Sequence, residues 1–433
     1  MALPAELLEQ IVGHIPDTSS VKSCCLASSV LVYPCQKRLY NILTLPLADP
    51  ATWERASERF QQVPHLLQHV EHLAIELSLL DLADSVWPDF FAKLLNLKSV
   101  SIMAGSTSGL IGWPTVPEPV AVALAALLRA RHAHPLSRVS LTRVSQLSTE
   151  IVLLSFRATA RLAITSCNIV EDDETPLVEM STDESAGTGT AVSLRHSANI
   201  VKRFAQSPIL RSLVACISSL AVSGHKQAIG NVLTLCQCVA PTISHLELPP
   251  SWQLSMSGSQ STALPSSWPN LLSVTLHLRK AELEDTSVLS WTLSALISSI
   301  LPPDTCPALR DLIVVLDIPI DDMAGLEYAF DEVGLVEDEF DYTQPIPWSL
   351  DRTRLAAIDG LAAAHPRLAT VQWTVVVNFD SIGLVEDASE RLRAGSPAAC
   401  IQYDACCAAL RSEMPRMMEM GRLSFRGQDS SRR

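Results

Sequence analysis

The sequence predicts an α/β chain with a three-helix N-terminal segment and, behind it, an irregular leucine-rich-repeat solenoid with a curved parallel sheet. Three observations predict this architecture. A strand-like motif of the form L-x-x-L-x-L recurs through most of the 433 residues, with other aliphatic residues replacing some leucines. Helix-like stretches separate the copies of the motif. The first 45 residues read as helical, and their only glycine is Gly13.

Seven segments carry the strand motif clearly, and two carry it weakly. The clear ones are Val70–Leu77, Leu97–Met103, Leu136–Thr142, Ile243–Pro249, Leu271–Leu278, Leu309–Leu316 and Leu368–Val375; the weak ones are Ala160–Thr165 and Leu210–Cys216. Alternation of apolar and small residues at the end of each motif is typical of a short strand. The repeated strands therefore predict a stacked array in which each strand pairs in parallel with the next.

Polar residues inside these motifs predict a sheet with one buried face and one open, concave face. They lie between two apolar positions at Ser101, Ser140, Glu247, Thr275 and Gln372. A doubly wound α/β domain, the alternative architecture, covers both faces of its sheet, so its strands are continuous apolar runs. Leu309–Leu316 is the exception, and we expect it to be buried on both faces.

Helical patterns fill the intervals between the strand motifs. They are Asp84–Asn96, Glu118–Ala133, His225–Ala240, Leu283–Ile300 and Ser349–His365. Ser349 is a good start for the last of these helices, with Asp351 in its first turn. The predicted division is a helical domain over residues 1–45, a repeat array over residues 46–424 and a disordered basic tail over residues 425–433.

Composition narrows the function classes. With 48% hydrophobic and 18% charged residues the chain can bury a large core. A net charge of −14 argues against nucleic acid as a partner, because phosphate binding requires clustered Lys and Arg. The apolar stretch Thr286–Pro303 is serine-rich and too short for a membrane span, so we expect a buried helix there. Glu6 and Glu9 stand where a signal peptide has basic residues, so we expect a cytoplasmic or nuclear protein with eleven reduced, mostly buried cysteines.

Catalytic and metal-binding motifs are not evident in the sequence. His65, His69 and His72 are spaced as metal ligands can be on a helix, but no carboxylate or thiol completes a shell. The cysteine pair at 236 and 238 lacks the spacing of a structural zinc site, as do the cysteines at 400, 406 and 407. The expected catalytic, cofactor-binding and metal sites are therefore none. An α/β enzyme of unknown class stays open only with the doubly wound alternative.

The opening stretch LPAELLEQIVGHI is an amphipathic helix with one apolar stripe, formed by Leu7, Leu8, Ile11, Val12 and Ile15. Asp17 and the serines after it end this helix and can cap a second one. A third helix follows, with Lys37 and Arg38 expected to point outward. Three short helices bury little surface, so this segment needs either a partner or the adjoining array for stability. The alternative function for the segment is a cap that seals the first repeat of a stand-alone interaction scaffold.

These residues resemble the F-box family. The family pattern begins with Leu-Pro, Glu and two aliphatic residues, as at Leu3, Pro4, Glu6, Leu7 and Leu8. It continues with a Cys-rich helix (residues 24–27) and a basic-aliphatic-aromatic turn (residues 37–40); Leu31 stands where the family usually has Trp, and Ser28 replaces a common Cys. The array behind it is similar to that of F-box proteins of mushroom-forming fungi.

The resemblance implies a non-enzymatic substrate receptor of an SCF-type ubiquitin ligase. The F-box would dock on the adaptor protein, and through it on the cullin scaffold, while the repeat array holds a target protein of unknown identity. The resemblance assigns seven residues to adaptor binding, of which the last two match less closely: Leu3, Pro4, Leu7, Leu8, Ile11, Leu26 and Leu31. It implies no cofactor, nucleic acid or membrane partner.

Overall fold

The computed structural model describes residues 3–46, 50–77, 91–105, 109–131, 134–170, 189–224, 227–249, 254–255, 264–283, 293–294, 296–319, 350–378 and 397–427. The chain forms two compact units, Met1–Cys216 and Ile217–Arg433. Both units are α/β, and all strand pairs described in them are parallel.

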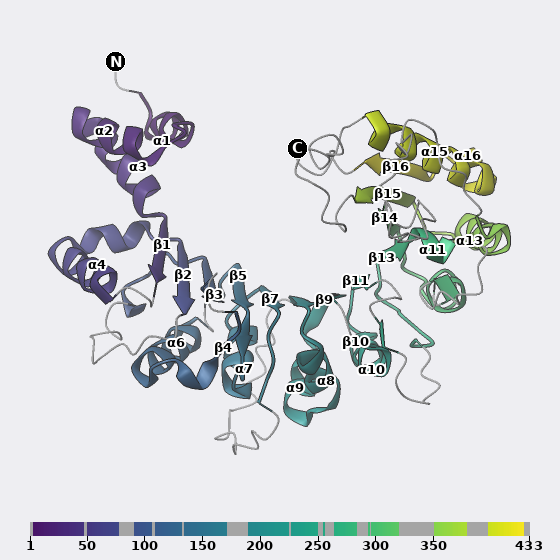
Figure 1. Ribbon diagram of the computed structural model, residues 1–433, viewed down its shortest axis with the longest axis horizontal. Coiled ribbons are helices and arrows are strands. Elements are labelled where there is room, and N and C mark those ends of the chain that lie inside the picture. The colour runs from purple at the N-terminus through teal and green to yellow at the C-terminus, as the bar shows by residue number, and fades with distance from the viewer. Residues whose placement is uncertain are drawn as a thin grey trace, which may run out of the picture. The chain divides into compact units, whose positions relative to one another are not determined.

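Unit 1 begins with three helices and continues as a parallel sheet in which successive strands are neighbours (Figure 1). The helices are α1 (Ala5–Gly13), α2 (Thr18–Ala27) and α3 (Ser29–Tyr40). The sheet order follows the chain through β1 (Ile42–Pro46), β2 (His72–Leu77), β3 (Ser99–Ala104), β5 (Arg138–Thr142), β7 (Arg161–Thr165) and β8 (Thr190–Arg195). The order does not reverse among these strands, as it does in a doubly wound sheet.

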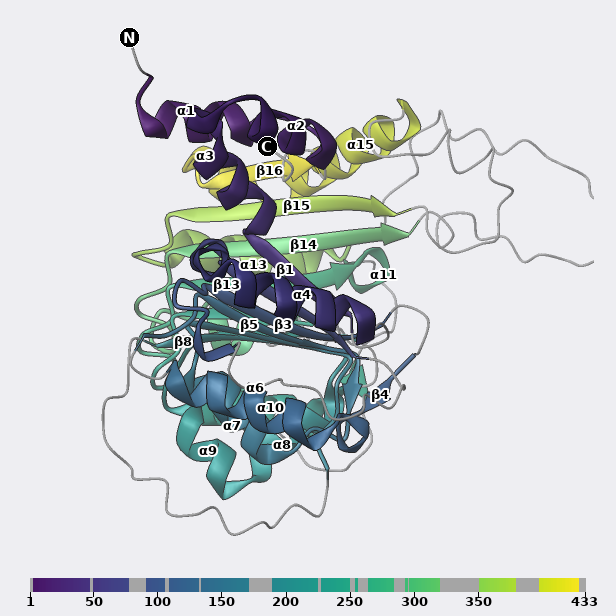
Figure 2. The same cartoon turned by 90° about the vertical axis from the view of Figure 1, so that its left-hand side faces the viewer.

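Helices follow the strands of unit 1 and lie on one side of the sheet (Figures 1 and 2). They are α4 (Pro50–Gln62), the 3-10 turn Pro64–His69, α6 (Glu118–Ala130), α7 (Thr149–Arg157), α8 (Ala198–Gln206) and α9 (Pro208–Val214). A second 3-10 turn, Trp113–Thr115, follows β4 (Ile111–Gly112), which pairs with β6 (Val144–Ser145) beside the main sheet. No described helix covers the other side of the main sheet, which we call the open face (Figure 1).

Unit 2 repeats this arrangement with its own parallel strands and helices. Its sheet order is β9 (Ile217–Ser223), β11 (His245–Leu248), β13 (Ser273–Arg279), β14 (Asp311–Pro319), β15 (Thr370–Asn378) and β16 (Leu423–Gly427). Its helices are α10 (Ile229–Val239), α11 (Lys280–Leu283), the π-helical turn Leu296–Ile300, α13 (Arg352–Ala364), α15 (Pro397–Glu413) and α16 (Pro415–Glu419). A small pair is formed by β10 (Gln227–Ala228) and β12 (Leu254–Ser255).

All seven clear strand motifs and the weak motif Ala160–Thr165 contain a strand, which confirms these predictions. The weak motif Leu210–Cys216 was predicted wrongly: it lies mostly in helix α9, and the strand begins after it, at Ile217. Pro208 favours the first turn of a helix. Leu210, Leu213 and Val214 are buried with the helical spacing of three and four residues. A short aliphatic run cannot be assigned to helix or strand from its pattern alone.

Burial alternates along the strands as the polar residues predicted. Ser101, Ser140, Glu247, Thr275 and Gln372 are half-buried, and each lies between two buried residues. The expectation that Leu309–Leu316 is buried on both faces is wrong. In β14 the side chains of Leu312, Val314, Leu316 and Ile318 are buried, while Ile313 and Val315 are half-buried on the open face.

The predicted helices are confirmed in part. Glu118–Ala133 contains α6, and Ser349–His365 contains α13, which Asp351 caps by accepting a hydrogen bond from the Arg354 amide at 3.0 Å. His225–Ala240 contains strand β10 before helix α10. Only parts of the predicted helices Asp84–Asn96 and Leu283–Ile300 lie within the described residues. Of the predicted tail, only residues 425–427 are described, and they form the end of β16. The rest of these three segments lies outside the described residues.

Candidate protein-binding surfaces

Helices α1, α2 and α3 enclose a small core of their own. Val12, Val21 and Cys35 are fully buried at its centre. The partly buried side chains Ile15, Cys24, Cys25, Leu31 and Leu39 pack around them. The second helix begins as the sequence predicted, because the Asp17 side chain accepts a hydrogen bond from the Ser20 amide at 2.7 Å. This bond also lowers the pKa of the Asp17 carboxyl.

The predicted single apolar stripe of α1 is divided between two faces. Val12 faces the core and Ile15 packs beside it. Leu3, Leu7 and Ile11 are 55%, 44% and 52% exposed, respectively. These three residues are four apart in sequence, so the helical repeat places the two within α1 on one face, with Leu3 directly ahead of it. We call this set of three residues the α1 apolar column.

The other residues assigned to adaptor binding are distributed differently. Pro4 is exposed at the start of α1, where its carbonyl accepts a hydrogen bond from the Leu8 amide at 3.2 Å. Leu26 is 90% exposed at the end of α2. Leu8 and Leu31 are half-buried, and Leu31 packs on the small core. Five of the seven residues are therefore exposed, and Leu31 contributes to the interior of the helical segment.

Lys37 and Arg38 do not point outward as predicted, because both bind back to α1. The Lys37 ammonium contacts the Glu9 carboxylate at 2.7 Å, and this hydrogen bond raises the pKa of Lys37. The Arg38 guanidinium donates hydrogen bonds to the carbonyls of Val12 and Ile15. Carbonyls at the end of a helix have no partner within it and carry partial negative charge, which a cation stabilises. The two basic residues thus fix α1 against α3.

Aromatic contacts join α3 to α4 and to the 3-10 turn Pro64–His69. The Tyr33 ring meets the buried His69 ring edge-on, with centroids 5.2 Å apart. Tyr40 meets Phe60 in the same manner at 6.3 Å, and the Arg59 guanidinium lies 5.4 Å from the Tyr40 centroid. The three-helix segment therefore packs on the rest of unit 1 through one face of α3.

The open face of unit 1 is the second candidate surface, and the strand register defines it. Its central row runs across the sheet through Thr44, Ala74, Ser101, Ser140, Ala163 and Ser193. Short side chains make this row flat. Arg138 and Arg161 lie on one side of it and Arg195 on the other, and all three are exposed. The local sequence pattern does not mark these arginines as a group. Aligning the motifs at 136–142 and 160–165 by their last apolar residues would have placed the first two in one column.

The open face of unit 2 differs because several of its charged groups are satisfied within the sheet. The His277 ring lies 3.1 Å from the Glu247 carboxylate on the neighbouring strand. The Asp311 carboxylate accepts a hydrogen bond from the Thr370 hydroxyl at 2.8 Å. The side chain of Gln372 also donates within the sheet, to the Thr374 hydroxyl at 3.1 Å.

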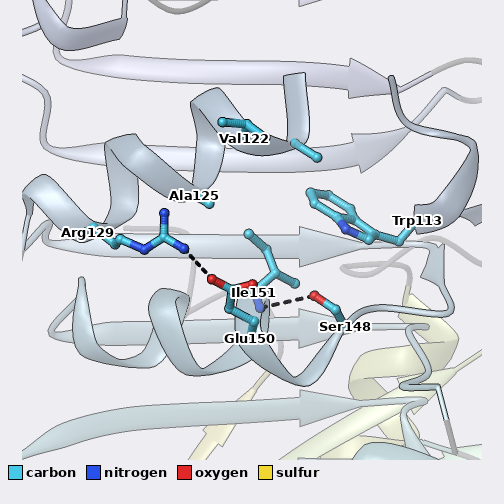
Figure 3. A pocket seen from close by; sticks show the side chains of 8 residues that line it. Trp113, Val122, Ala125, Arg129, Ser148, Glu150 and Ile151 are labelled. Atoms are coloured by element: carbon cyan, nitrogen blue, oxygen red, sulfur yellow. Dashed lines mark hydrogen bonds and ion pairs between the residues drawn. The ribbon is translucent and has the colours of Figure 1, made fainter. Parts of the chain in front are cut away.

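A shallow pocket of about 180 Å³ lies between α6 and α7 (Figure 3). Its charged and hydroxyl side chains already have partners, since Arg129 pairs with Glu150 and Ser148 caps α7 by accepting from the Ile151 amide. Sites for small molecules are usually deeper and about 300–1,000 Å³. This pocket therefore gives little support for a small-molecule site.

The histidine and cysteine patterns form no metal site within the part of the chain that the structure describes. His69 is buried against Tyr33, and His72 is hydrogen-bonded to the Ser99 hydroxyl at 2.7 Å. The eleven cysteines are all described and all are free thiols, six of them buried. Burial raises the pKa of Cys236 to about 12 and of Cys306 to about 12. Such thiols are structural apolar side chains.

None of the family models compared with the chain matches it, and no curated protein is detectably similar to it in sequence. Among the described residues, no helix has the length and hydropathy that crossing a membrane requires.

Proposed function

We propose that this chain is the substrate-recognition subunit of an SCF-type ubiquitin ligase and performs no catalysis itself. In this proposal residues 1–45 are an F-box that docks on the adaptor protein, which links the chain to the cullin scaffold. The strand–helix repeats form an irregular leucine-rich array, and an open sheet face of that array holds the target. The sequential strand order and the burial of a single sheet face support a leucine-rich array.

The α1 apolar column carries the proposal. Single exposed aliphatic residues are common, but a row of them at a spacing of four residues, along a helix and the residues just before it, marks a surface for another protein. The helical segment already has its own core in Val12, Val21 and Cys35, so the column is not needed to complete it. Leu26, which the resemblance also assigns to adaptor binding, is exposed as well.

The test uses the full chain and a purified SCF adaptor protein. The variant Leu7→Asp with Ile11→Asp should weaken adaptor capture by more than about tenfold, because burying one Leu or Ile side chain contributes about 1.5–3 kcal/mol. Both residues are exposed, so the thermal melt should hardly change. The matched control is Leu95→Asp with Leu110→Asp, two exposed leucines elsewhere in unit 1. Equal capture by the wild type and the Leu7/Ile11 variant would refute adaptor docking.

One observation favours the cap as a second function. Tyr33 and Tyr40 tie α3 to His69 and Phe60 of the array, as a cap on its first repeat would. A chain lacking residues 1–40 distinguishes the two functions, and this cut leaves strand β1 in place beside β2. A cap predicts a large fall in the melting temperature of that chain and no adaptor capture by the full-length protein.

A further inference from the structure

The open face of unit 1 has an excess of positive charge, although the chain as a whole has a net charge of −14. On the described strands this face carries Arg138, Arg161 and Arg195 against one acidic residue, Glu76. The guanidinium groups of the three arginines have no hydrogen-bond or ion-pair partner among the described residues. A cationic surface on an acidic protein is selective for anionic groups.

Arg138 and Arg161 form a pair across neighbouring strands. The register Val139↔Leu162 places them side by side on β5 and β7, so their Cα atoms are about 4.8 Å apart. Like charges directly opposite one another destabilise a sheet. A carboxylate between the two guanidinium groups would remove that repulsion and accept charge-assisted hydrogen bonds from both.

Arg195 adds a third positive charge at a defined distance along the strands. Arg161 is opposite Ala191 on β8, so Arg195 lies four residues farther along, about 13 Å. Between them the open face shows only the short side chains of Ala163, Ser193 and Thr165. The hydroxyls of Ser193 and Thr165 make no hydrogen bond with the described residues. The floor between the charges is thus flat enough for an extended backbone and offers it polar partners.

We propose that this face binds an extended acidic segment of a partner protein whose carboxylates are four residues apart. One carboxylate lies between Arg138 and Arg161, and the other pairs with Arg195. Four residues of extended chain span about 13 Å, the same distance that separates the arginine pair from Arg195. This proposal rests on the proposed function in one respect, because it names the class of target that the receptor holds.

The experiment measures the fluorescence anisotropy of labelled peptides with the full chain. The probe is a Gly-Ser peptide with Glu at every fourth position. A second peptide has the same composition with its Glu residues in one block, and a third has Gln in place of Glu. The spaced peptide should bind several-fold tighter than the block peptide, the Gln peptide should not bind, and salt should weaken binding because exposed ion pairs are screened.

Variants of the full chain locate the site. Arg161→Ala and Arg195→Ala should each weaken binding of the spaced peptide by up to about fivefold, as expected for exposed ion pairs. The matched control is Arg129→Ala, which removes an exposed arginine from α6 on the helix-covered side of the sheet. It should leave the affinity unchanged. The arginines are exposed, so circular dichroism spectra should be the same for all of these variants.

Three results would overturn the inference. They are equal affinity for the spaced and block peptides, no effect of Arg161→Ala and Arg195→Ala, and tighter arginine-dependent binding of a single-stranded oligonucleotide than of the peptide. The assay contains no adaptor, so it fails independently of the proposed function. Adaptor capture with no peptide binding overturns this inference alone, while peptide binding without adaptor capture overturns the ubiquitin-ligase role alone.

Discussion

His365 offers a sharp test of how unit 2 is held together, because its burial is evident only from the structure. The ring is fully buried, and its Nε2 donates to the Cys306 carbonyl at 3.0 Å. Its Nδ1 accepts from the amides of Arg367 and Leu368 at 3.3 and 3.1 Å. The ring is therefore neutral, with one nitrogen donating and the other accepting.

The change His365→Ala leaves the buried Leu368 amide without a partner and removes one of two hydrogen bonds to the Cys306 carbonyl, which also accepts from the Leu309 amide at 3.1 Å. An unsatisfied buried amide costs about 1–3 kcal/mol and the lost hydrogen bond to Cys306 about 1 kcal/mol more, so we expect the free energy of unfolding to fall by about 3 kcal/mol. In His365→Asn the side-chain oxygen can still accept from the amides two and three residues on, as in an Asx turn. That variant should lose about half as much, because only the bond to Cys306 is removed.

The chain contains its own control. The tripeptide Ala-His-Pro occurs at 133–135 and again at 364–366, but His134 is exposed. His134→Ala should change the free energy of unfolding by less than about 0.5 kcal/mol. Urea unfolding of the full chains, followed by circular dichroism, measures all three variants. Equal small losses for His134→Ala and His365→Ala would refute the claim that the buried hydrogen bonds hold this turn.

Two further predictions concern protonation and thiol chemistry. Burial lowers the pKa of His69 below its usual 6.5, so in acid the unfolded chain binds a proton there that the folded chain excludes, and the melting temperature of unit 1 should fall as the pH drops below about 6.5. The variant His69→Phe, which keeps an aromatic ring beside Tyr33, should lessen that fall. The same pH profile for the variant and the wild type would contradict this prediction. Iodoacetamide at pH 8 should label the exposed Cys400 in the folded protein but label Cys236 and Cys306 only in denaturant, because burial and raised pKa values suppress their thiolates. Mass spectrometry detects the labelled cysteines. Equal labelling rates for all three in the folded protein would contradict the burial of Cys236 and Cys306.

Local pattern was sufficient for most of the sheet. In motifs such as Leu271–Leu278, every second residue is apolar because one side of the strand is buried. This alternation can be recognised within the motif alone. Helix Glu118–Ala130 was found for the same reason, from apolar positions three and four residues apart. The pattern failed at Leu210–Cys216, where seven residues with few polar positions fit a helix as well as a strand.

Tertiary contacts decided what the pattern left open in the N-terminal segment. The stripe of α1 was visible in the sequence, but which part of it is buried depends on α3, whose Cys35 meets Val12 and leaves Leu7 and Ile11 exposed. The return of Arg38 to the end of α1 has the same origin, because the sequence pattern suggests a solvated basic side chain until the carbonyls at the end of another helix are placed beside it.

The sequence by itself determined the α/β class, the alternation of strand and helix, the single buried face of the strands and the helical start of the chain. Only the tertiary structure decided the register. Register brings Arg138 beside Arg161 although 23 positions separate them in sequence, and it places Arg195 four residues along the next strand. A side chain's own neighbours in sequence set its face of the sheet, whereas its neighbours across the sheet depend on how the intervening chain folds back.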